Sequence, residues 1–255
     1  MNGHVAAIFR HPVKGFTPEG LAHVDLAPGE GFPHDRAWAV ENGPSGYDPA
    51  APAFVPKQKF TVLAAIPRVA AARTRFDDAT GVLSAQAPGH AGFAGRLADP
   101  EGREAFAAWL GALLGDEAKG PLKVVEARGT FRFTDHPKGD VSVVNMASVR
   151  DLSAKRGVEL DPLRFRANIY VEGWPAWVEN DWADCDLMMG WARAQVFKPI
   201  VRCAATHVDP TTAVRDHDVV KALFDHYGHM FCGVYIHMAT AGRVSLGDAV
   251  TEPKP

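Results

Sequence analysis

The chain has 255 residues, of which 47% are hydrophobic and 22% are charged, a composition that is ordinary for a globular protein with a sizeable core. Its formal net charge of −3 at pH 7 excludes a global basic field that would recruit nucleic acid or an anionic membrane surface. The N-terminus lacks the pattern of a secretion signal, and no stretch approaches the roughly 20 apolar residues of a membrane span, so we expect a soluble, cytoplasmic protein.

The first hundred residues favour β-structure. Short apolar runs alternate with turn formers such as glycine and proline, and turns are expected at 27–31, 43–49 and 77–81. The last of these turns, DDATG, suits a hairpin loop. The expected strands are VAAIF (5–9), HVDLA (23–27), AWAVE (37–41), FTVLAAI (60–66) and VLSAQA (82–87).

The rest of the chain mixes helices with strands. A helix is predicted from Arg103 to about Leu114, because apolar residues recur there on one helical stripe. A second helix is predicted over 148–156, beginning at Asn145 or Ala147 and ended by Gly157, and a third over 217–227. The expected strands in this part are 122–127, 141–144, 168–172 and 194–197.

The segment FCGVYIHM near the C-terminus alternates between apolar and other residues. This pattern predicts a strand with Cys232, Val234, Ile236 and Met238 on one side, so that Cys232 is buried in a sheet face. We find no internal repeat, low-complexity tract or long linker. The two halves of the chain are therefore expected to share one continuous body.

Cys203 lies in the segment FKPIVRCAATHVDPTTA, after an apolar run and next to Arg202. Pro199 cannot donate a ladder hydrogen bond, which predicts an edge or a strand end, where functional residues are commonly mounted. A neighbouring cation favours the thiolate that nucleophilic attack and metal ligation both need. The chain has three widely spaced cysteines, which we expect to be reduced. From these residues alone, Cys203 can be a buried filler, a nucleophile or a ligand.

Three basic residues lie at strand boundaries. Lys14 follows a proline in PVKG, Arg36 precedes the strand AWAVE, and Arg166 precedes the strand NIYVE. Phosphate binding requires several donors that converge from different elements. Taken singly, each residue is an ordinary solvated surface charge, but their recurrence at strand mouths points to an anion site.

A zinc site has weaker support. His226, His229 and Cys232 have a spacing that zinc ligands can adopt. However, the third helix is expected to end near Tyr227 and the next strand to begin near Phe231. That arrangement distributes the three side chains over a turn and a core face, where they do not converge on one metal ion.

Hydrolase and nucleotide-binding signatures are also weak. Ser142 and Ser148 are not embedded in G-x-S-x-G, so no nucleophile elbow is indicated. Cys203 and His207 leave cysteine hydrolase chemistry open, although spacing alone does not establish a triad. The glycine-rich loops that bind dinucleotides or nucleoside triphosphates do not occur.

Seven motifs follow one another in the order found in a known family. They are PVKG (12–15), GFPHDRAWAV (31–40), FRANIYVEG (165–173), an EN-DW-D pattern (179–184), MGWARAQV (189–196), VRCAATHVDPTTA (201–213) and GRVSLGD (242–248). Together they resemble the MOSC domain proteins that carry an N-terminal MOSC β-barrel domain, similar to the mitochondrial amidoxime-reducing component and the bacterial YcbX proteins. The resemblance covers nearly the whole chain.

This resemblance implies a fold and a domain division. The fold is α+β and β-rich, with a MOSC-type mixed β-barrel packed against an N-terminal β-barrel-like domain and a few helices. The expected domains are residues 1–100 for the N-terminal β-barrel domain and residues 101–255 for the MOSC domain.

The resemblance also implies a molybdenum cofactor, that is, molybdopterin with its metal, bound between the two parts. In such proteins the cysteine of the R-C motif donates a thiolate to molybdenum, a role that falls on Cys203, with Arg202 beside the metal. Thiolate is a sensible ligand for a metal that the pterin already holds through sulfur. Lys14, Arg36 and Arg166 correspond to the residues that hold the pterin phosphate.

The same resemblance implies further contacts to the cofactor, and it shows where this chain departs from the family pattern. Asn145 and Ser148 match a region that offers polar contacts to the cofactor, where exposed N–H groups at a helix start suit an anion. Gly15, included in the expected cofactor site, stands where relatives often carry serine. Ala167 replaces a common proline, and Ala213 replaces a glycine that usually closes the turn.

The implied activity is a two-electron oxidoreductase that reduces N-hydroxylated or other N-oxygenated compounds. Electrons are expected from a separate protein, a small ferredoxin, a cytochrome b5-like protein or a flavin reductase, because three cysteines cannot supply the four thiolates of an iron–sulfur cluster. His207 is a possible proton donor. The alternatives are a sulfur-transfer protein with a persulfide on Cys203 and a cofactor-binding module without turnover.

Overall fold

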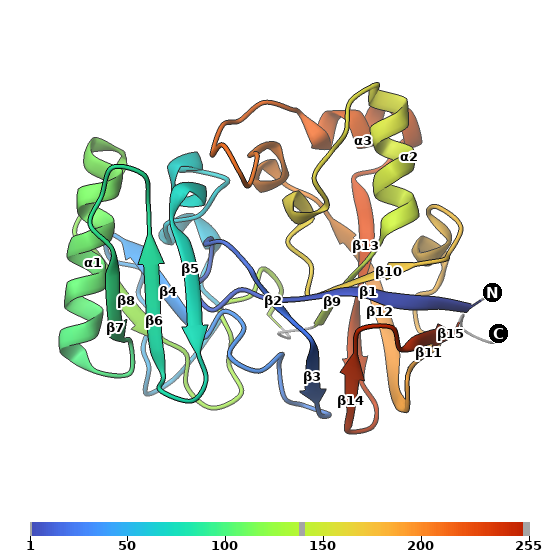
Figure 1. Ribbon diagram of the computed structural model, residues 1–255, viewed down its shortest axis with the longest axis horizontal. Helices are drawn as coiled ribbons and strands as arrows, with labels where there is room; N and C mark the ends of the chain where they lie inside the picture. The colour runs from blue at the N-terminus through green and yellow to red at the C-terminus, as the bar shows by residue number, and fades with distance from the viewer. Residues whose placement is uncertain (1, 138–140, 252–255) are drawn as a thin grey trace.

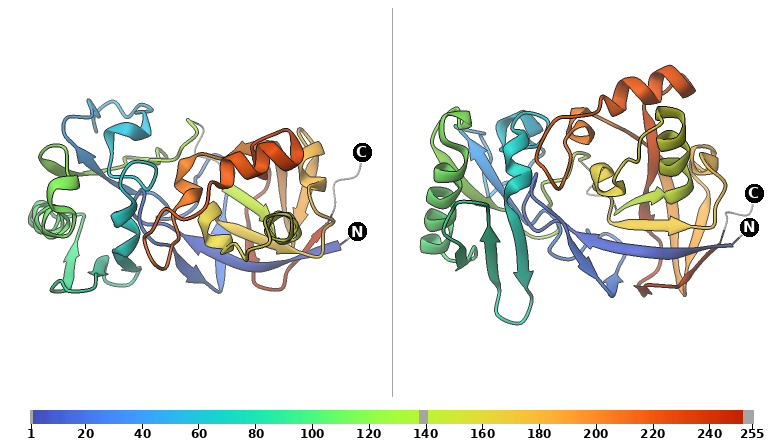
Figure 2. Two further views of the ribbon diagram at one scale, coloured as in Figure 1. Left: turned by 90° about the horizontal axis from the view of Figure 1, so that it is seen from above. Right: turned by 45° about the horizontal axis from the view of Figure 1, so that its top comes forward.

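The computed structural model describes residues 2–137 and 141–251. Two β-rich bodies lie side by side, and the views in Figures 1 and 2 separate them clearly. One body consists mainly of N-terminal residues, and the other is a barrel that contains both ends of the described chain. The expectation of a β-rich α+β protein with a mixed barrel is confirmed.

Seven strands close the barrel. Their order is β10-β9-β13-β12-β11-β15-β1, and β1 returns to pair with β10, while β2 extends the sheet beside β1. Only β9 and β10 run parallel among these pairs. The bounds are β1 (Asn2–Arg10), β2 (Glu19–Leu21), β9 (Val141–Asn145), β10 (Ile169–Glu172), β11 (Asp186–Met189), β12 (Ala192–Val201), β13 (Phe231–Met238) and β15 (Ala249–Thr251).

Apolar side chains fill the barrel, as alternation along the strands requires. In β13, Val234 and Ile236 are fully buried in this interior cluster. Cys232 is also fully buried, as predicted, but it packs in a different cluster, with the helices outside the barrel. Gly233 separates the two, with φ of 77°, and this left-handed residue interrupts the regular alternation of the strand.

Two helices cover one side of the barrel: α2 (Met146–Arg156) and α3 (Val219–Tyr227). Asn145 caps α2, because its side chain accepts a hydrogen bond from the Ala147 N–H, and Gly157 ends the helix in the left-handed conformation. Both signals were predicted. The third helix begins two residues later than predicted, since Asp218 is its N-cap.

The N-terminal body contains two small sheets and one helix. Helix α1 (Pro100–Leu114) packs on β7 and β8, and its predicted apolar stripe is buried. The expected strand over 60–66 is wrong: Phe60 makes only an isolated bridge to Glu41, and residues 62–66 form a turn. The strands are β4 (Trp38–Asn42) with β8 (Leu122–Glu126), and β5 (Arg73–Asp77), β6 (Val82–Gln86) and β7 (Phe93–Arg96).

The two bodies are joined by more than one segment. Strand β1 leaves the barrel and leads into the N-terminal body, and β3 (His23–Leu26) returns to pair with β14 (Gly242–Ser245). The expected domain boundary between residues 100 and 101 coincides with the start of α1 and stays a prediction. Short 3-10 helices occur at η1 (Lys57–Lys59), η2 (Pro67–Ala71), η3 (Gly115–Glu117), η4 (Pro162–Phe165), η5 (Val178–Asp181) and η6 (Ala204–His207).

Within the described ranges, no helix combines the length and the apolar character that crossing a bilayer requires.

Candidate functional site

A cavity of about 420 Å³ lies where the two bodies meet, a size that is ordinary for a small-molecule site. Residues from the N-terminal body, from the segment before β9 and from the end of β12 contribute to its wall. Six of the eight expected site residues line it: Lys14, Gly15, Arg36, Arg166, Arg202 and Cys203.

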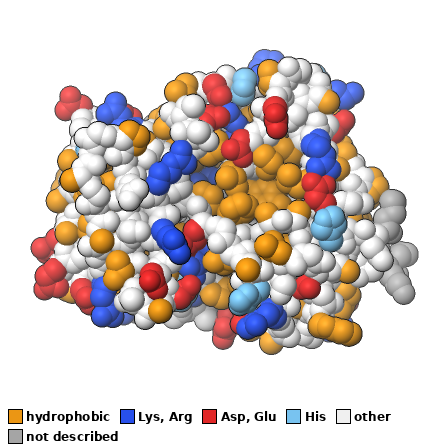
Figure 3. All heavy atoms as spheres, viewed as in Figure 1, with side chains coloured by type: hydrophobic (Ala, Val, Ile, Leu, Met, Phe, Trp, Pro, Cys, Tyr) orange, Lys and Arg blue, Asp and Glu red, His pale blue; other side chains and the backbone are white. Residues whose placement is uncertain are grey.

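A second hollow, beside α2, lacks such chemistry. Figure 3 shows hydrophobic side chains gathered in a depression on this face of the molecule. The hollow next to α2 is open and mainly apolar, with Val149, Leu160 and Pro162 in its lining and no cysteine. We therefore place the functional site at the boundary between the bodies.

Cys203 is half-buried, forms no disulfide bond and lies just after the end of a strand. β12 ends at Val201, and Cys203 is the residue immediately before η6. The strand end was predicted: past Val196, which still bonds the backbone of Asp184 and Cys185, β12 pairs only with β13, so Pro199 lies where one side of the ladder is open. The sulfur therefore borders the cavity at the end of a well-supported strand.

Arg202 is buried, and its side chain donates hydrogen bonds to backbone carbonyls. Its Nε donates to the Cys232 carbonyl at 2.8 Å and its Nη1 to the Phe165 carbonyl at 2.6 Å. Its backbone N–H donates to the Met230 carbonyl at 2.8 Å. Arg202 thus ties the segment that carries Cys203 to β13 and to η4, while part of it faces the cavity.

Lys57 contacts the cysteine and was not predicted. Its Nζ lies 3.1 Å from Cys203 Sγ and 3.1 Å from Asp135 Oδ2. Burial opposes the charge of Lys57, but Asp135 and the Cys203 sulfur outweigh it and raise the pKa of Lys57. Lys57 and Cys203 are 146 positions apart, and nothing in the sequence PKQK marks this lysine as functional.

Lys14 is almost fully buried at the same wall. Its Nζ donates to the Phe133 carbonyl at 2.9 Å and to Asp135 Oδ1 at 2.6 Å. Burial lowers the pKa of Lys14, and Asp135 opposes this effect. Burial raises the pKa of Asp135, but the two lysines outweigh it and hold that pKa below its usual range. Asp135, which the sequence did not indicate, is the anion that Lys14 and Lys57 share.

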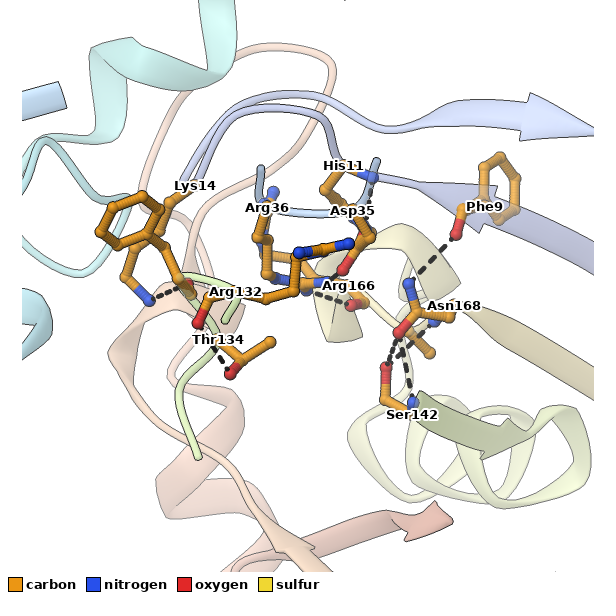
Figure 4. Close-up of polar contacts among 12 residues, drawn as sticks. Phe9, His11, Lys14, Asp35, Arg36, Arg132, Thr134, Ser142, Arg166 and Asn168 are labelled. Atoms are coloured by element: carbon orange, nitrogen blue, oxygen red, sulfur yellow. Dashed lines mark hydrogen bonds and ion pairs between the residues drawn. The ribbon is translucent and has the colours of Figure 1, made fainter. Parts of the chain in front are cut away.

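Arg36 and Arg166 lie together, with Lys14 to one side, as Figure 4 shows. The backbone of both residues adopts the left-handed conformation, with φ of 49° at Arg36 and 52° at Arg166. This strained conformation is found preferentially at functional sites. Arg36 pairs with Asp35, and its Nη2 donates to the Arg166 carbonyl at 3.1 Å. Arg166 Nη1 donates to the Phe16 carbonyl at 2.7 Å. Arg166 Nη2 is buried and has no hydrogen-bond partner among the described residues.

Burial and neighbouring charges together determine the protonation states of His11, Asp35 and Arg166. Desolvation, together with repulsion by Arg166 and Arg36, lowers the pKa of His11 to about 3, so His11 is neutral at pH 7. Asp35 is buried as well, yet Arg36 outweighs the desolvation and keeps its pKa below the usual range. Desolvation, with repulsion by Arg36, lowers the pKa of Arg166 to about 10, and the side chain still carries its charge.

Two of the three departures from the family pattern have structural reasons, and the third, Ala213, has none. Gly15 has φ of 90°, and a Cβ there would lie 2.5 Å from the Thr61 carbonyl oxygen, so a serine requires a different backbone. The Ala167 N–H donates to Tyr170 Oη at 3.1 Å, a bond that proline cannot make. Ala213 has φ of 59°, in a conformation that favours glycine.

Asn145 and Ser148 do not join the cavity. Both are fully buried and bind the carboxyl group of Glu179: Asn145 Nδ2 donates to Oε2 at 2.9 Å and Ser148 Oγ to Oε1 at 2.8 Å. Burial raises the pKa of Glu179. Since neither side chain is available to a ligand in the cavity, we correct the expectation for these two residues and assign them a structural role.

Two earlier ideas concerned histidines: His207 as a proton donor, and a weakly supported zinc site at His226, His229 and Cys232. The geometry supports neither. His207 is not part of the cavity wall, and its Nε2 lies 3.1 Å from Asp218 Oδ1 at the start of α3. His229 Nδ1 accepts a hydrogen bond from the Phe231 N–H, while Cys232 is buried elsewhere. No group of three metal-ligating side chains occurs among residues 2–137 and 141–251, so the described chain offers no zinc site.

The cavity therefore combines a thiol with a cluster of cations, most of them held by carboxylates or carbonyls. Such an arrangement suits an anionic ligand that presents a soft metal to sulfur.

Comparisons with known proteins agree with this geometry. Residues 2–118 match the family model of the MOSC N-terminal beta barrel domain, and residues 130–251 match that of the MOSC domain. No curated protein matches the chain.

Solved structures with a similar chain course include the YUAD protein from Bacillus subtilis, with 13% identity, a TM-score of 0.46 and coverage of 98% of this chain and 94% of that chain. YiiM from Geobacillus stearothermophilus has 17% identity and a TM-score of 0.36, with coverage of 45% of this chain and 54% of that chain. YiiM from Escherichia coli has 15% identity, a TM-score of 0.32 and the same two coverages, 45% and 54%.

Proposed function

The chain is a MOSC domain protein with a MOSC N-terminal β-barrel domain, and from this membership we propose that its cavity binds the molybdenum cofactor and that it is an oxidoreductase for N-oxygenated compounds. MOSC domains are associated with binding of this cofactor. One observation supports the proposal: Cys203 lines the same cavity as Lys14, Arg36 and Arg166, which come from three separate segments of the chain.

The residues present fit such a cofactor. A phosphate group requires several converging donors, and the buried Nη2 of Arg166 is a donor without a partner in the described part of the chain. Lys14 and Arg36 add charge at the same wall. The described residues lack a ligand set that could hold a metal alone, so the metal would be held by sulfur of the cofactor with Cys203 as the protein ligand.

The protein contributes position and charge. Cys203 would orient the metal, and Lys57, whose ammonium lies 3.1 Å from the sulfur, would stabilise negative charge on it. Lys14, Arg36 and Arg166 would fix the phosphate end. When bound, the cofactor would supply the two-electron reduction of an N–O bond, in which an N-hydroxy group, two protons and two electrons give N–H and water. A ferredoxin, a cytochrome b5-like protein or a flavin reductase would deliver the electrons.

The first test concerns Cys203. Protein from a host that makes the cofactor is expected to contain about one molybdenum per chain and to reduce benzamidoxime with reduced methyl viologen as donor. Cys203→Ser is expected to lose activity by about 100-fold or more, because it removes the protein ligand. The matched control is Cys185→Ser, since Cys185 packs against the barrel core and does not line the cavity. Full turnover by Cys203→Ser would contradict the assignment.

A second measurement separates binding from turnover. Arg166→Gln is expected to reduce the molybdenum content of folded, monodisperse protein, because the cavity loses a buried cation. Arg243→Gln is the control: this arginine is exposed and pairs with Asp25 away from the cavity. If Arg166→Gln retains the metal content of the control, the phosphate role of Arg166 is wrong.

The alternative is a sulfur carrier, in which Cys203 holds a persulfide. The same lysine contact would stabilise that anion. A carrier requires the thiol but not a clamp of three further cations, which is why we favour the cofactor. Cyanide-labile sulfur on Cys203 in protein that contains no molybdenum would support the carrier instead.

A further inference from the structure

The end of β12 is irregular where it passes the cavity. Its register with β13 shifts between Val196 and Lys198 and again between Pro199 and Val201. Such bulges bend a strand and redirect its side chains, and they occur frequently beside active sites. Val196 still points into the barrel interior, whereas Lys198 and Pro199 line the cavity. The bulges thus place a lysine on the barrel wall of the site.

The contacts of the Lys198 side chain differ from those of its neighbours. Lys14 and Lys57 share Asp135, Arg36 pairs with Asp35, and Arg202 donates to backbone carbonyls. The Lys198 ammonium instead lies over the Phe197 ring, with its Nζ 5.4 Å from the ring centroid. No described carboxylate lies within ion-pair distance of it.

This contact holds the lysine without neutralising it. A ring beneath an ammonium group stabilises its position modestly, and the aliphatic stem packs while the head stays accessible. Lys198 is half-buried and opposite Tyr235 in the register of β12 and β13, and both residues line the cavity. A charge held in this way is ready for an anion that comes from outside the chain.

Lys198 belongs to a different element from each residue of the proposed cofactor clamp. Lys14 and Arg36 lie in loops after β1 and β3, and Arg166 follows η4, whereas Lys198 belongs to the barrel strand β12. Its neighbours in the cavity wall include the aromatic residues Phe231 and Tyr235. This part of the wall suits a flat ring that carries an acidic group.

We propose that Lys198 binds a carboxylate or phosphate group of the substrate, so that the preferred N-oxygenated substrates are aromatic anions. The inference rests on the proposed function and specifies its substrate class. A charge-assisted hydrogen bond of this kind changes affinity by about tenfold to a hundredfold.

The kinetic test compares two substrates that differ by one acidic group. With reduced methyl viologen as donor, wild-type protein is expected to show a kcat/KM for 4-carboxybenzamidoxime about tenfold or more above that for benzamidoxime. Lys198→Gln is expected to bring this ratio close to one, and Lys198→Arg to restore most of it. Lys221→Gln, on the exposed face of α3, is the control and keeps the wild-type ratio. A wild-type ratio near one overturns the proposal.

Two further measurements locate the effect. The molybdenum content of Lys198→Gln is expected to equal that of wild type; loss of the metal would assign Lys198 to the cofactor phosphate and overturn the proposal. Calorimetric binding of 4-carboxybenzamidoxime, measured without an electron donor, is expected to weaken about tenfold or more in Lys198→Gln, whereas the uncharged benzamidoxime serves as the reference. Unchanged binding of the carboxylate overturns the proposal even if no oxime is reduced, which separates its failure from that of the proposed function.

Discussion

Ala213 occupies a left-handed position, with φ of 59°, in the turn that follows Asp209 and Pro210. This conformation costs an L-residue roughly 1–2 kcal/mol. Glycine avoids that cost but loses about 0.5–1 kcal/mol more backbone entropy on folding. We therefore expect Ala213→Gly to raise the free energy of unfolding by about 0.5–1 kcal/mol. Urea denaturation followed by circular dichroism measures the change.

Ala154→Gly is the control for this substitution. Ala154 lies on α2 with right-handed helical geometry, so there the same replacement is expected to lower the free energy of unfolding by about 1 kcal/mol. Equal effects of the two substitutions would show that the conformation of Ala213 contributes nothing.

Several single residues that the sequence singled out line one cavity, and others were missed for a physical reason. Lys14, Arg36, Arg166 and Cys203 stand out because each follows or precedes a recognisable strand motif, and all four line one cavity. Asp135 and its partner lysine at position 57 were not predicted. They lie in segments without a motif, and only the folded chain brings them together.

Helix α2 begins on a buried polar network. Asn145 caps the helix and also donates to Glu179, which Ser148 binds from the next turn. Removing the asparagine side chain would cost the cap and leave a buried carboxyl oxygen with one donor fewer. We expect Asn145→Ala to lower the free energy of unfolding by about 2–4 kcal/mol, as measured by chemical denaturation.

Asp218→Ala provides the comparison, since Asp218 is the exposed cap of α3 and its loss is expected to cost about 1 kcal/mol. Molybdenum content per folded chain is expected to be the same in Asn145→Ala and in wild type. A selective loss of metal would return Asn145 to the cofactor site and contradict its structural role.

Elements with end signals could be predicted, and those without could not. Asn145 and Gly157 mark both ends of α2, which the structure confirms. The apolar run over 60–66 has no such signal, and a short buried run is compatible with a strand or a turn. There the Ala65 and Ile66 N–H groups donate to the Val62 carbonyl, so local hydrogen bonds replace the expected ladder.

At the scale of the whole molecule, the barrel depends on a strand from the other end of the chain. β1 pairs with β10 and β15, and without it both strands would have an open edge. We expect a fragment of residues 129–255 to aggregate when it is produced alone. Gel filtration and amide NMR dispersion measure the outcome.

Co-production of residues 1–128 with residues 129–255 is the control and is expected to restore a soluble complex, because the first fragment supplies β1 and β3. A fragment 129–255 that is monomeric and well dispersed on its own would contradict the dependence on β1.

The whole-molecule arrangement was predictable only through the family resemblance. Alternation in single strands does not specify that residues 2–10 pair with residues 169–172, more than 150 positions away. Family membership supplied the closed barrel, while the positions of the charged side chains in the cavity required the folded structure.

β15 is synthesised long after β1, and this order affects folding during translation. β1 leaves the exit tunnel long before its barrel neighbour β15, which consists of residues 249–251. Loop closure over such a distance is slow, and this pairing cannot form before β15 has been synthesised. Until β15 emerges, the buried side of β1 lacks one of its two barrel neighbours, so we expect a chaperone to bind this segment of the nascent chain.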